Sequence, residues 1–261
     1  MGGSRGGGSR DGGGRRGGKG GRAASGRSGD SGRGLGQKLR PGKQRSESSR
    51  RWLSRQLSDR YVAEARLQGY RSRAAFKLTQ LDDKAQFLKR GARVVDLGAA
   101  PGGWTQVAVE RVGQAKDAQS NRIVGIDIVE VEPIPGAVLL CGDVRTPEAL
   151  VRVREALEGP ADVVLSDMAA PSIGHAKTDH LRIMGLIEIA LDFAEDILAP
   201  GGTFVAKVLQ GGTEAEILTR LKQGFTQVRH IKPPASRQES AEMYVVATGF
   251  RGHATGPDAE D

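Results

Sequence analysis

A glycine-rich string, D-L-G-A-A-P-G-G-W, occupies residues 96–104 directly after an apolar run. The apolar run predicts a strand, and the string predicts a turn that leads into a helix. Open α/β sheets bind ligands at the carboxyl ends of their strands, and glycines let a ligand approach the backbone. The spacing matches neither the glycine pattern of dinucleotide sites nor that of P-loops. The string therefore predicts a site for another small ligand and disfavours a nicotinamide dehydrogenase.

Three aspartates, Asp127, Asp143 and Asp167, follow successive predicted strands. Because the carboxyl ends of parallel strands share one edge of a sheet, we expect all three to face the same crevice as Gly98. Taken singly, each could be an ordinary loop residue or a helix cap. Together they suit a ligand that carries ribose hydroxyls, an amino group and a positively charged sulfonium.

Lys207 lies near the end of a strand predicted over residues 203–208 and has apolar neighbours. An exposed lysine at a strand end is one interpretation. Burying an ammonium is costly unless it is paired. A buried Lys207 among acids would therefore be a candidate base.

Two glutamates precede the last predicted strand, and spacing alone does not choose between Glu239 and Glu242. Arg237 and Lys232 in the same loop could hold a phosphate, although a solvated loop is the simpler interpretation for single charges. His175 and His180 follow Asp167, but no carboxylate spacing supports a metal, so they are interpreted as loop and helix-start residues.

Apolar runs alternate with amphipathic segments from residue 91 onward, which predicts an α/β fold with a mostly parallel seven-stranded sheet covered on both faces. The last two strands, joined by a proline-rich loop, should form an antiparallel hairpin at one edge. Ser72 is the predicted N-cap of a helix that contains Lys77, and Thr146 that of a helix at 147–157. The predicted strands are 93–97, 122–128, 137–140, 162–166, 203–208, 227–231 and 243–248, and the other predicted helices are 52–68, 104–112, 180–198 and 214–222.

Charge is distributed unevenly along the 261 residues: the net charge is +11 over residues 1–51, +5 over 52–90 and −8 over 91–261. The first segment is rich in Gly, Arg and Ser and has few large apolar side chains, so we expect a disordered basic tail. A folded domain is expected over residues 52–251, beginning with basic helices at 52–90, and a short tail at 252–261. A basic end beside an acidic body suggests that a polyanion is held at that end.

The single cysteine, Cys141, excludes an internal disulfide and is interpreted as a small buried residue on a strand. No apolar run approaches the ~20 residues of a membrane span. The amino-terminal stretch has no apolar segment typical of a secretory signal. We therefore expect a cytoplasmic protein that does not bind membranes.

With these residues identified, the chain from Trp52 to Arg251 resembles the bacterial large-subunit ribosomal RNA 2′-O-methyltransferase family, the heat-shock methyltransferases of the FtsJ type. The motifs that carry the resemblance are S-R-A-A-F-K-L at 72–78, the string at 96–104, G-D-V at 142–144, S-D-M-A at 166–169, V-A-K at 205–207, S-R at 236–237 and E-M-Y at 242–244. The long basic tail departs from the short amino terminus of the family. The fold that the resemblance implies is the Rossmann-like class I fold of S-adenosylmethionine-dependent methyltransferases.

The resemblance also implies roles for residues. A catalytic set of lysine, aspartate, lysine and glutamate falls on Lys77, Asp167, Lys207 and Glu242, which selects Glu242 over Glu239. The cofactor S-adenosyl-L-methionine is expected against Gly102, Trp104, Asp127, Asp143 and Asp167, without a metal. Family members methylate a uridine of 23S ribosomal RNA, normally in an assembled or nearly assembled 50S subunit, so the expected partner is large-subunit RNA and the protein is expected to be a monomer.

In this interpretation Lys207 accepts the proton of a ribose 2′-hydroxyl while the site aligns that hydroxyl with the methyl donor. Lys77 would oppose a charge on Lys207, and the two acids would orient the amines. RNA is expected to approach over the basic helices and to contact Arg71 and Arg73. The alternatives are the same chemistry on transfer RNA and a catalytically idle RNA-binding factor of ribosome assembly.

Overall fold

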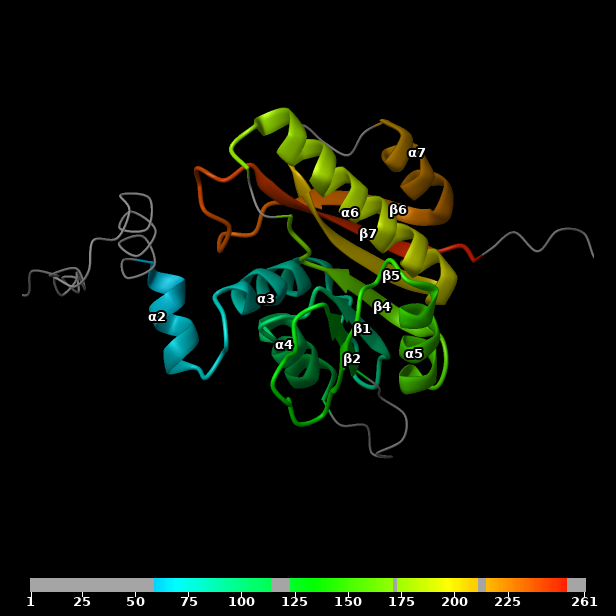
Figure 1. Cartoon of the computed structure of the whole chain (residues 1–261), viewed down its shortest axis with the longest axis horizontal. Helices are drawn as coiled ribbons and strands as arrows, with labels where there is room; N and C mark the ends of the chain where they lie inside the picture. Colours follow the sequence, from blue (N-terminus) through cyan, green and yellow to red (C-terminus); the bar gives the residue numbers. More distant parts are fainter. Residues whose placement is uncertain (1–58, 114–122, 171–172, 211–214, 253–261) are drawn as a thin grey trace, which may run out of the picture. The chain divides into compact units, whose positions relative to one another are not determined.

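A seven-stranded sheet forms the centre of the protein in the computed structural model, which describes residues 59–113, 123–170, 173–210 and 215–252 (Figure 1). All of these residues belong to one unit of the chain, Gln37–Asp261. The strand order is β3-β2-β1-β4-β5-β7-β6. The strands are β1 (Val94–Leu97), β2 (Ile123–Asp127), β3 (Val138–Cys141), β4 (Ala161–Ser166), β5 (Leu198–Leu209), β6 (Phe225–Ile231) and β7 (Glu242–Phe250).

The first five strands pair in parallel, and β7 pairs antiparallel with both β5 and β6. The predicted mostly parallel sheet with an antiparallel pair at one edge is therefore confirmed. Parallel sheets are normally buried on both faces, which explains the apolar runs in the sequence. In this pair β7 lies between β5 and β6, and β6 forms the edge of the sheet.

Helices pack on both faces of the sheet and form two apolar cores (Figure 1). Successive strand residues point to opposite faces, so Val94 joins one core and Val95 the other. One core takes α3 (Ala74–Ala85) and α4 (Gly103–Val112), and the other takes α5 (Pro147–Leu157), α6 (Ala176–Ile197) and α7 (Ala215–Gly224). None of the helices in the described residues is both long and apolar enough to cross a membrane.

The helix starts follow the capping rules in some places and depart from them in others. Thr146 caps α5 by accepting from the Ala149 amide, and Pro147 occupies the first turn, as predicted. The predicted cap at Ser72 is wrong, because α3 begins at Ala74 after Arg73 and the buried Ser72 hydroxyl has no hydrogen-bond partner among the described residues.

Two further expectations need correction. Helix α6 starts at Ala176, four residues before the predicted start, with the His175 ring as its N-cap. Cys141 is exposed, because β3 is the edge strand of the sheet and has no neighbour on its outer side.

The break predicted near Arg60 in the first helix corresponds to the start of α2 (Arg60–Leu67), which Asp59 caps. The expected tail at 1–51, the helical segment 52–58, and all of the expected tail at 252–261 except Gly252 lie outside the described residues.

Burial along α6 gives a direct test of this packing. Leu191 is fully buried, whereas Leu181 in the same helix is 62% exposed. We expect Leu191→Ala to lower the free energy of unfolding by about 2–5 kcal/mol, because it leaves a cavity in the core. The matched variant Leu181→Ala should change it by less than about 0.5 kcal/mol. Urea denaturation measures both values, and equal losses would contradict this position of α6.

Candidate active site

Four ionisable side chains meet at the carboxyl edge of the sheet, beside the ends of β4 and β5. Lys77 Nζ lies 2.8 Å from Glu242 Oε2 and 4.0 Å from Asp167 Oδ2, and Lys207 Nζ lies 2.7 Å from Asp167 Oδ1. Lys207 also donates to the Asp167 carbonyl at 2.8 Å. Their side chains are only 10–17% exposed. The structure thus brings together the four residues that the sequence analysis assigned to one catalytic set.

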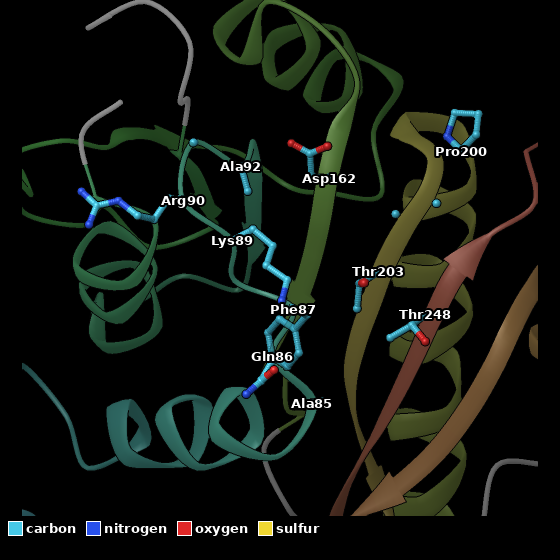
Figure 2. A pocket seen from close by; sticks show the side chains of 13 residues that line it. Ala85, Gln86, Phe87, Lys89, Arg90, Ala92, Asp162, Pro200, Thr203 and Thr248 are labelled. Atoms are coloured by element: carbon cyan, nitrogen blue, oxygen red, sulfur yellow. The ribbon is translucent and has the colours of Figure 1, made fainter. Parts of the chain in front are cut away.

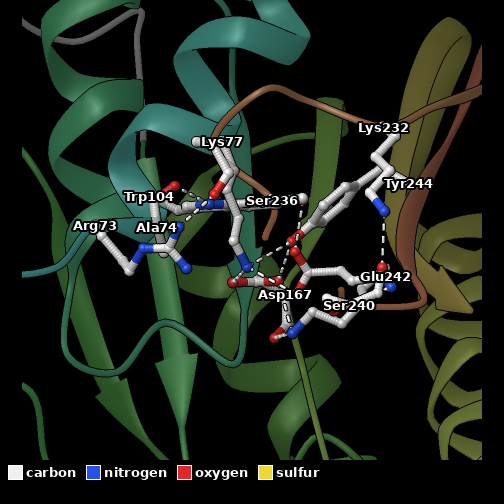
Figure 3. A network of polar contacts seen from close by, with 12 residues as sticks. Arg73, Ala74, Lys77, Trp104, Asp167, Lys232, Ser236, Ser240, Glu242 and Tyr244 are labelled. Atoms are coloured by element: carbon white, nitrogen blue, oxygen red, sulfur yellow. Dashed lines mark hydrogen bonds and ion pairs between the residues drawn. The ribbon is translucent and has the colours of Figure 1, made fainter. Parts of the chain in front are cut away.

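A fifth residue, Tyr244, lies at the centre of the cluster and was not assigned a role from the sequence (Figure 3). Its hydroxyl donates to Asp167 Oδ1 at 2.7 Å and accepts from Lys77 Nζ at 3.1 Å. Its ring is fully buried, 5.6 Å from the ring of Trp104. Burial, followed by the negative charges of Asp167 and Glu242, raises the pKa of Tyr244 well above its usual value. Tyr244 therefore stays neutral and serves as a hydrogen-bond donor.

Strand register explains how these residues meet. Ser166 of β4 is paired with Ala206 of β5, so the residues that follow them, Asp167 and Lys207, lie side by side. Lys207 is also paired directly with Tyr244 across the antiparallel β5 and β7. Side chains directly opposite each other in a pair share one face of the sheet.

The structure also separates the two candidate glutamates. Glu242 is the first residue of β7 and lies two positions before Tyr244, so both project from the same face. Its carboxylate accepts from Lys77 Nζ at 2.8 Å and from the Ser236 hydroxyl at 2.7 Å. Glu239 is exposed on the preceding loop. Geometry therefore places Glu242, and not Glu239, in the cluster.

The loop before β7 is held by charged side chains that the sequence suggested could bind phosphate. Lys232 Nζ donates to the backbone carbonyls of Gln238 and Ser240, at 3.2 and 2.8 Å (Figure 3). Arg237 donates to Asp59 Oδ2 at 3.4 Å. In this structure both cations therefore brace the loop.

Two of the aspartates predicted to bind a ligand differ in their surroundings. Asp127 accepts from the amides of Ala100, in the glycine-rich turn, and Val129, both at 2.9 Å, which fixes it beside that turn. Asp143 is paired with Arg145 across both carboxylate oxygens. The hydrogen bonds from Arg145 lower the pKa of Asp143 to about 2, so it is ionised at neutral pH.

Gly102 and Trp104 hold the turn in place. Gly102 has a φ of +113°, a backbone conformation that other residues rarely adopt, so a substitution there would strain the turn. The Trp104 side chain is buried in the core and donates to the Ala74 carbonyl at 2.8 Å. A ligand in this turn could therefore meet the Trp104 backbone, whereas its indole is a packing group.

Asp96, the first residue of the glycine-rich string, is fully buried beneath this turn. Thr105 donates to its Oδ2 at 2.6 Å, while Oδ1 has no hydrogen-bond partner among the described residues. Burial raises the pKa of Asp96 to about 7 against the lowering effect of Thr105, and the charges of Asp167 and Asp127 add to the increase.

Arg71 and Arg73, which we expect to contact RNA, make internal contacts in this structure. Arg73 Nη2 donates to the Ala235 carbonyl at 2.5 Å, and its Nε lies 3.0 Å from Asp59 Oδ2 without hydrogen-bond geometry. Arg71 donates to the backbone carbonyls of Pro101, Glu132 and Pro133. Charge reversal at either position would disrupt packing beside the turn and the loop, so it would not isolate an effect on RNA binding.

The histidines give no sign of a metal centre. His175 caps α6 and His180 lies in its second turn. No group of three or more His, Cys, Asp or Glu side chains in the described residues is arranged to hold a metal ion.

A pocket of about 550 Å³ opens at the other end of the sheet (Figure 2). Its lining includes Ala92 just before β1, Asp162 near the start of β4, and Thr203 of β5. None of the predicted site residues lines it. Ligands of open α/β sheets bind at the carboxyl ends of the strands, so the residue cluster outweighs this pocket as the candidate site.

Comparison with known proteins agrees with the cluster. Residues 70–250 match the family model described as FtsJ-like methyltransferase. The chain is 64% identical over 220 residues to the "Ribosomal RNA large subunit methyltransferase E" of Paramagnetospirillum magneticum, covering 84% of this chain and 90% of that protein. Its identity to the protein of the same name from Xanthobacter autotrophicus is 57%, covering 87% of this chain and 88% of the relative.

A solved structure shows a similar fold. The crystal structure of a ribosomal RNA methyltransferase from Plasmodium falciparum aligns with a TM-score of 0.63 and 35% sequence identity. The alignment covers 70% of this chain and 100% of that one.

The raised pKa of Asp96 predicts a specific dependence of stability on pH. Between the ordinary pKa of about 4 and the folded value, the folded protein binds more protons than the unfolded chain. The contribution of Asp96 to the free energy of unfolding must therefore fall as pH rises from about 4 to about 7, and the loss is complete above that window. Asp96→Asn keeps an acceptor for Thr105 but cannot ionise.

We expect Asp96→Asn to gain stability relative to the unchanged protein across this window, by about 2–4 kcal/mol in all. Urea denaturation without ligand at pH 4 to 8 gives the difference between the two proteins. Parallel stability profiles would show that Asp96 does not titrate in this range.

Proposed function

This chain belongs to the FtsJ-like methyltransferase family, and we propose that it transfers a methyl group from S-adenosyl-L-methionine to the ribose 2′-hydroxyl of a uridine in 23S ribosomal RNA. The observation that carries the proposal is the buried cluster of Lys77, Asp167, Lys207 and Glu242, with Tyr244 between them. Relatives named for methylation of large-subunit ribosomal RNA support the choice of substrate.

The residues at the carboxyl edge of the sheet fit this cofactor. Asp127 and Asp143 can accept from hydroxyl and amino groups, and Asp167 supplies negative charge for a cationic ligand. Ile128 and Val129, beside Asp127, are 70% and 58% exposed and offer apolar surface of the kind on which a purine packs. We propose that these residues, with the backbone of Gly102 and Trp104, hold the cofactor.

S-adenosyl-L-methionine supplies an activated methyl group on a positive sulfonium. The protein must then align the ribose hydroxyl and remove its proton. We assign that proton to the Lys207 amine. The ammonium formed on Lys207 would be stabilised by Asp167 Oδ1, 2.7 Å away.

Lys77 and Glu242 complete the site as a pair. Glu242 holds Lys77 in place at 2.8 Å. Tyr244 fixes Asp167 between the two lysines. The substrate proposed is ribosomal RNA in a 50S subunit or its precursor, bound by a monomer in the cytoplasm.

The assignment of Lys207 gives a kinetic prediction. We expect Lys207→Ala to lower kcat by about a hundredfold or more, because it removes the proton acceptor, and to leave the Kd for S-adenosylmethionine little changed. Lys222→Ala, which removes an exposed lysine from α7, is the matched control. Transfer of labelled methyl groups to 50S subunits and calorimetry measure the two quantities. Near-normal turnover of Lys207→Ala would refute the assignment.

The substrate is tested by mapping ribose methylation in a strain that lacks this gene. We expect one uridine of 23S ribosomal RNA to lose its 2′-O-methyl group and to regain it when the intact gene, but not Lys207→Ala, is restored. Mapping transfer RNA from the same strains is the comparison. Loss confined to transfer RNA would replace the proposed substrate, and no loss in either RNA would favour a catalytically idle assembly factor.

A further inference from the structure

Ser236 is a buried serine that contacts the catalytic cluster directly. Its hydroxyl donates to Glu242 Oε1 at 2.7 Å, and the side chain is only 5% exposed (Figure 3). The other carboxylate oxygen, Oε2, accepts from Lys77. Each oxygen of Glu242 thus has its own donor, one neutral and one charged.

The backbone around Ser236 is fixed to the helix that carries Lys77. The amide of Ala235 donates to Gln80 Oε1 at 2.7 Å, and the Ala235 carbonyl accepts from Arg73 Nη2 at 2.5 Å. Gln80 lies in α3, three residues after Lys77, and Arg73 immediately precedes that helix. The amide of Ser236 closes a turn by donating to the Pro233 carbonyl at 2.8 Å.

We propose that Ser236 is a positioning residue for methyl transfer, which acts by holding the Glu242 carboxylate in the orientation that fixes Lys77. The inference rests on the proposed function. Two donors at a defined distance from one another leave the carboxylate a single orientation, because rotating it would break one hydrogen bond. A hydrogen bond to a charged group is also stronger than one between neutral groups.

The consequence of losing the hydroxyl follows from burial. In Ser236→Ala, Oε1 of a mostly buried carboxylate loses its Ser236 donor, so Glu242 can turn and Lys77 loses its fixed partner. Within the described residues, the hydrogen bonds of Ser236 go to Glu242 and Pro233, and none goes to the glycine-rich turn. The effect should therefore fall on the chemical step and spare the binding of S-adenosylmethionine.

The first experiment compares single variants. We expect Ser236→Ala to lower kcat about tenfold or more, the loss typical of one hydrogen bond to a charged group, with KM for 50S subunits and Kd for S-adenosylmethionine within about twofold. Ser236→Thr keeps the hydroxyl and should recover most of the rate. Gln238→Ala, an exposed change two residues along the same loop, is the control and should behave like the unchanged protein.

The second experiment is a double-mutant cycle with Glu242→Gln. If Ser236 acts through Glu242, adding Ser236→Ala to Glu242→Gln should lower kcat by less than about twofold further. A full tenfold further loss would overturn the proposal, because Ser236 would then act on another group. Unchanged kcat in Ser236→Ala, or equal loss of turnover and cofactor binding, would also overturn it.

These outcomes are separable from failure of the proposed function. If the unchanged protein does not methylate ribosomal RNA, the proposed function is wrong, and the positioning role that rests on it is overturned with it. If the unchanged protein is active and Ser236→Ala is equally active, only the positioning role is wrong.

Discussion

Two lysines and two acidic residues share a small volume at the carboxyl edge of the sheet, where their side chains are 10–17% exposed. Removing charges from water is costly, and mutual pairing with hydrogen bonds is what offsets the cost. The nearby Asp167 and Glu242 offset the cost of burying the two lysines, and the lysines offset the cost of burying the two acids. The four elements that supply them, α3, β4, β5 and β7, must therefore be held in a single arrangement.

The antiparallel strand β7 is what makes this arrangement possible. In a parallel sheet every strand reaches the ligand-binding edge with its carboxyl end, so each strand contributes only its last residues to the site. Because β7 runs in the opposite direction beside β5, its first residues reach the same edge: Glu242 pairs with Leu209, and Tyr244 with Lys207. The position of β7 between β5 and β6 thus brings a glutamate and a tyrosine from late in the chain beside the lysine of β5.

The sequence was most informative where a strand ends. An apolar run followed by a polar residue marks both the strand and its ligand edge, and this pattern alone led to Asp127, Asp167 and Lys207. Family resemblance, rather than spacing, was needed to choose Glu242 over Glu239, because both precede the strand predicted over residues 243–248.

The errors have physical causes that lie outside local sequence. Ser72 has the side chain of a helix cap, but helix α3 begins two residues later and leaves its hydroxyl buried. Cys141 was expected to be buried, but exposure depends on which strand lies at the edge, a property of the whole sheet. The hydrogen bonds of Tyr244 with Lys77 and Asp167 join residues 167 and 77 positions apart, so no local pattern could reveal them.

The attraction of an RNA substrate depends on where the protein carries its positive charge. The sequence from residue 52 onward has a net charge of −3, the sum of +5 over 52–90 and −8 over 91–261, although an RNA substrate is a polyanion. Arg71, Arg73, Lys232 and Arg237 are engaged in internal contacts that brace the turn and the loop. The largest excess of positive charge lies in residues 1–51, at +11. We therefore expect long-range attraction to RNA to come mainly from this amino-terminal charge, and because such attraction is screened by salt, it should weaken as ionic strength rises.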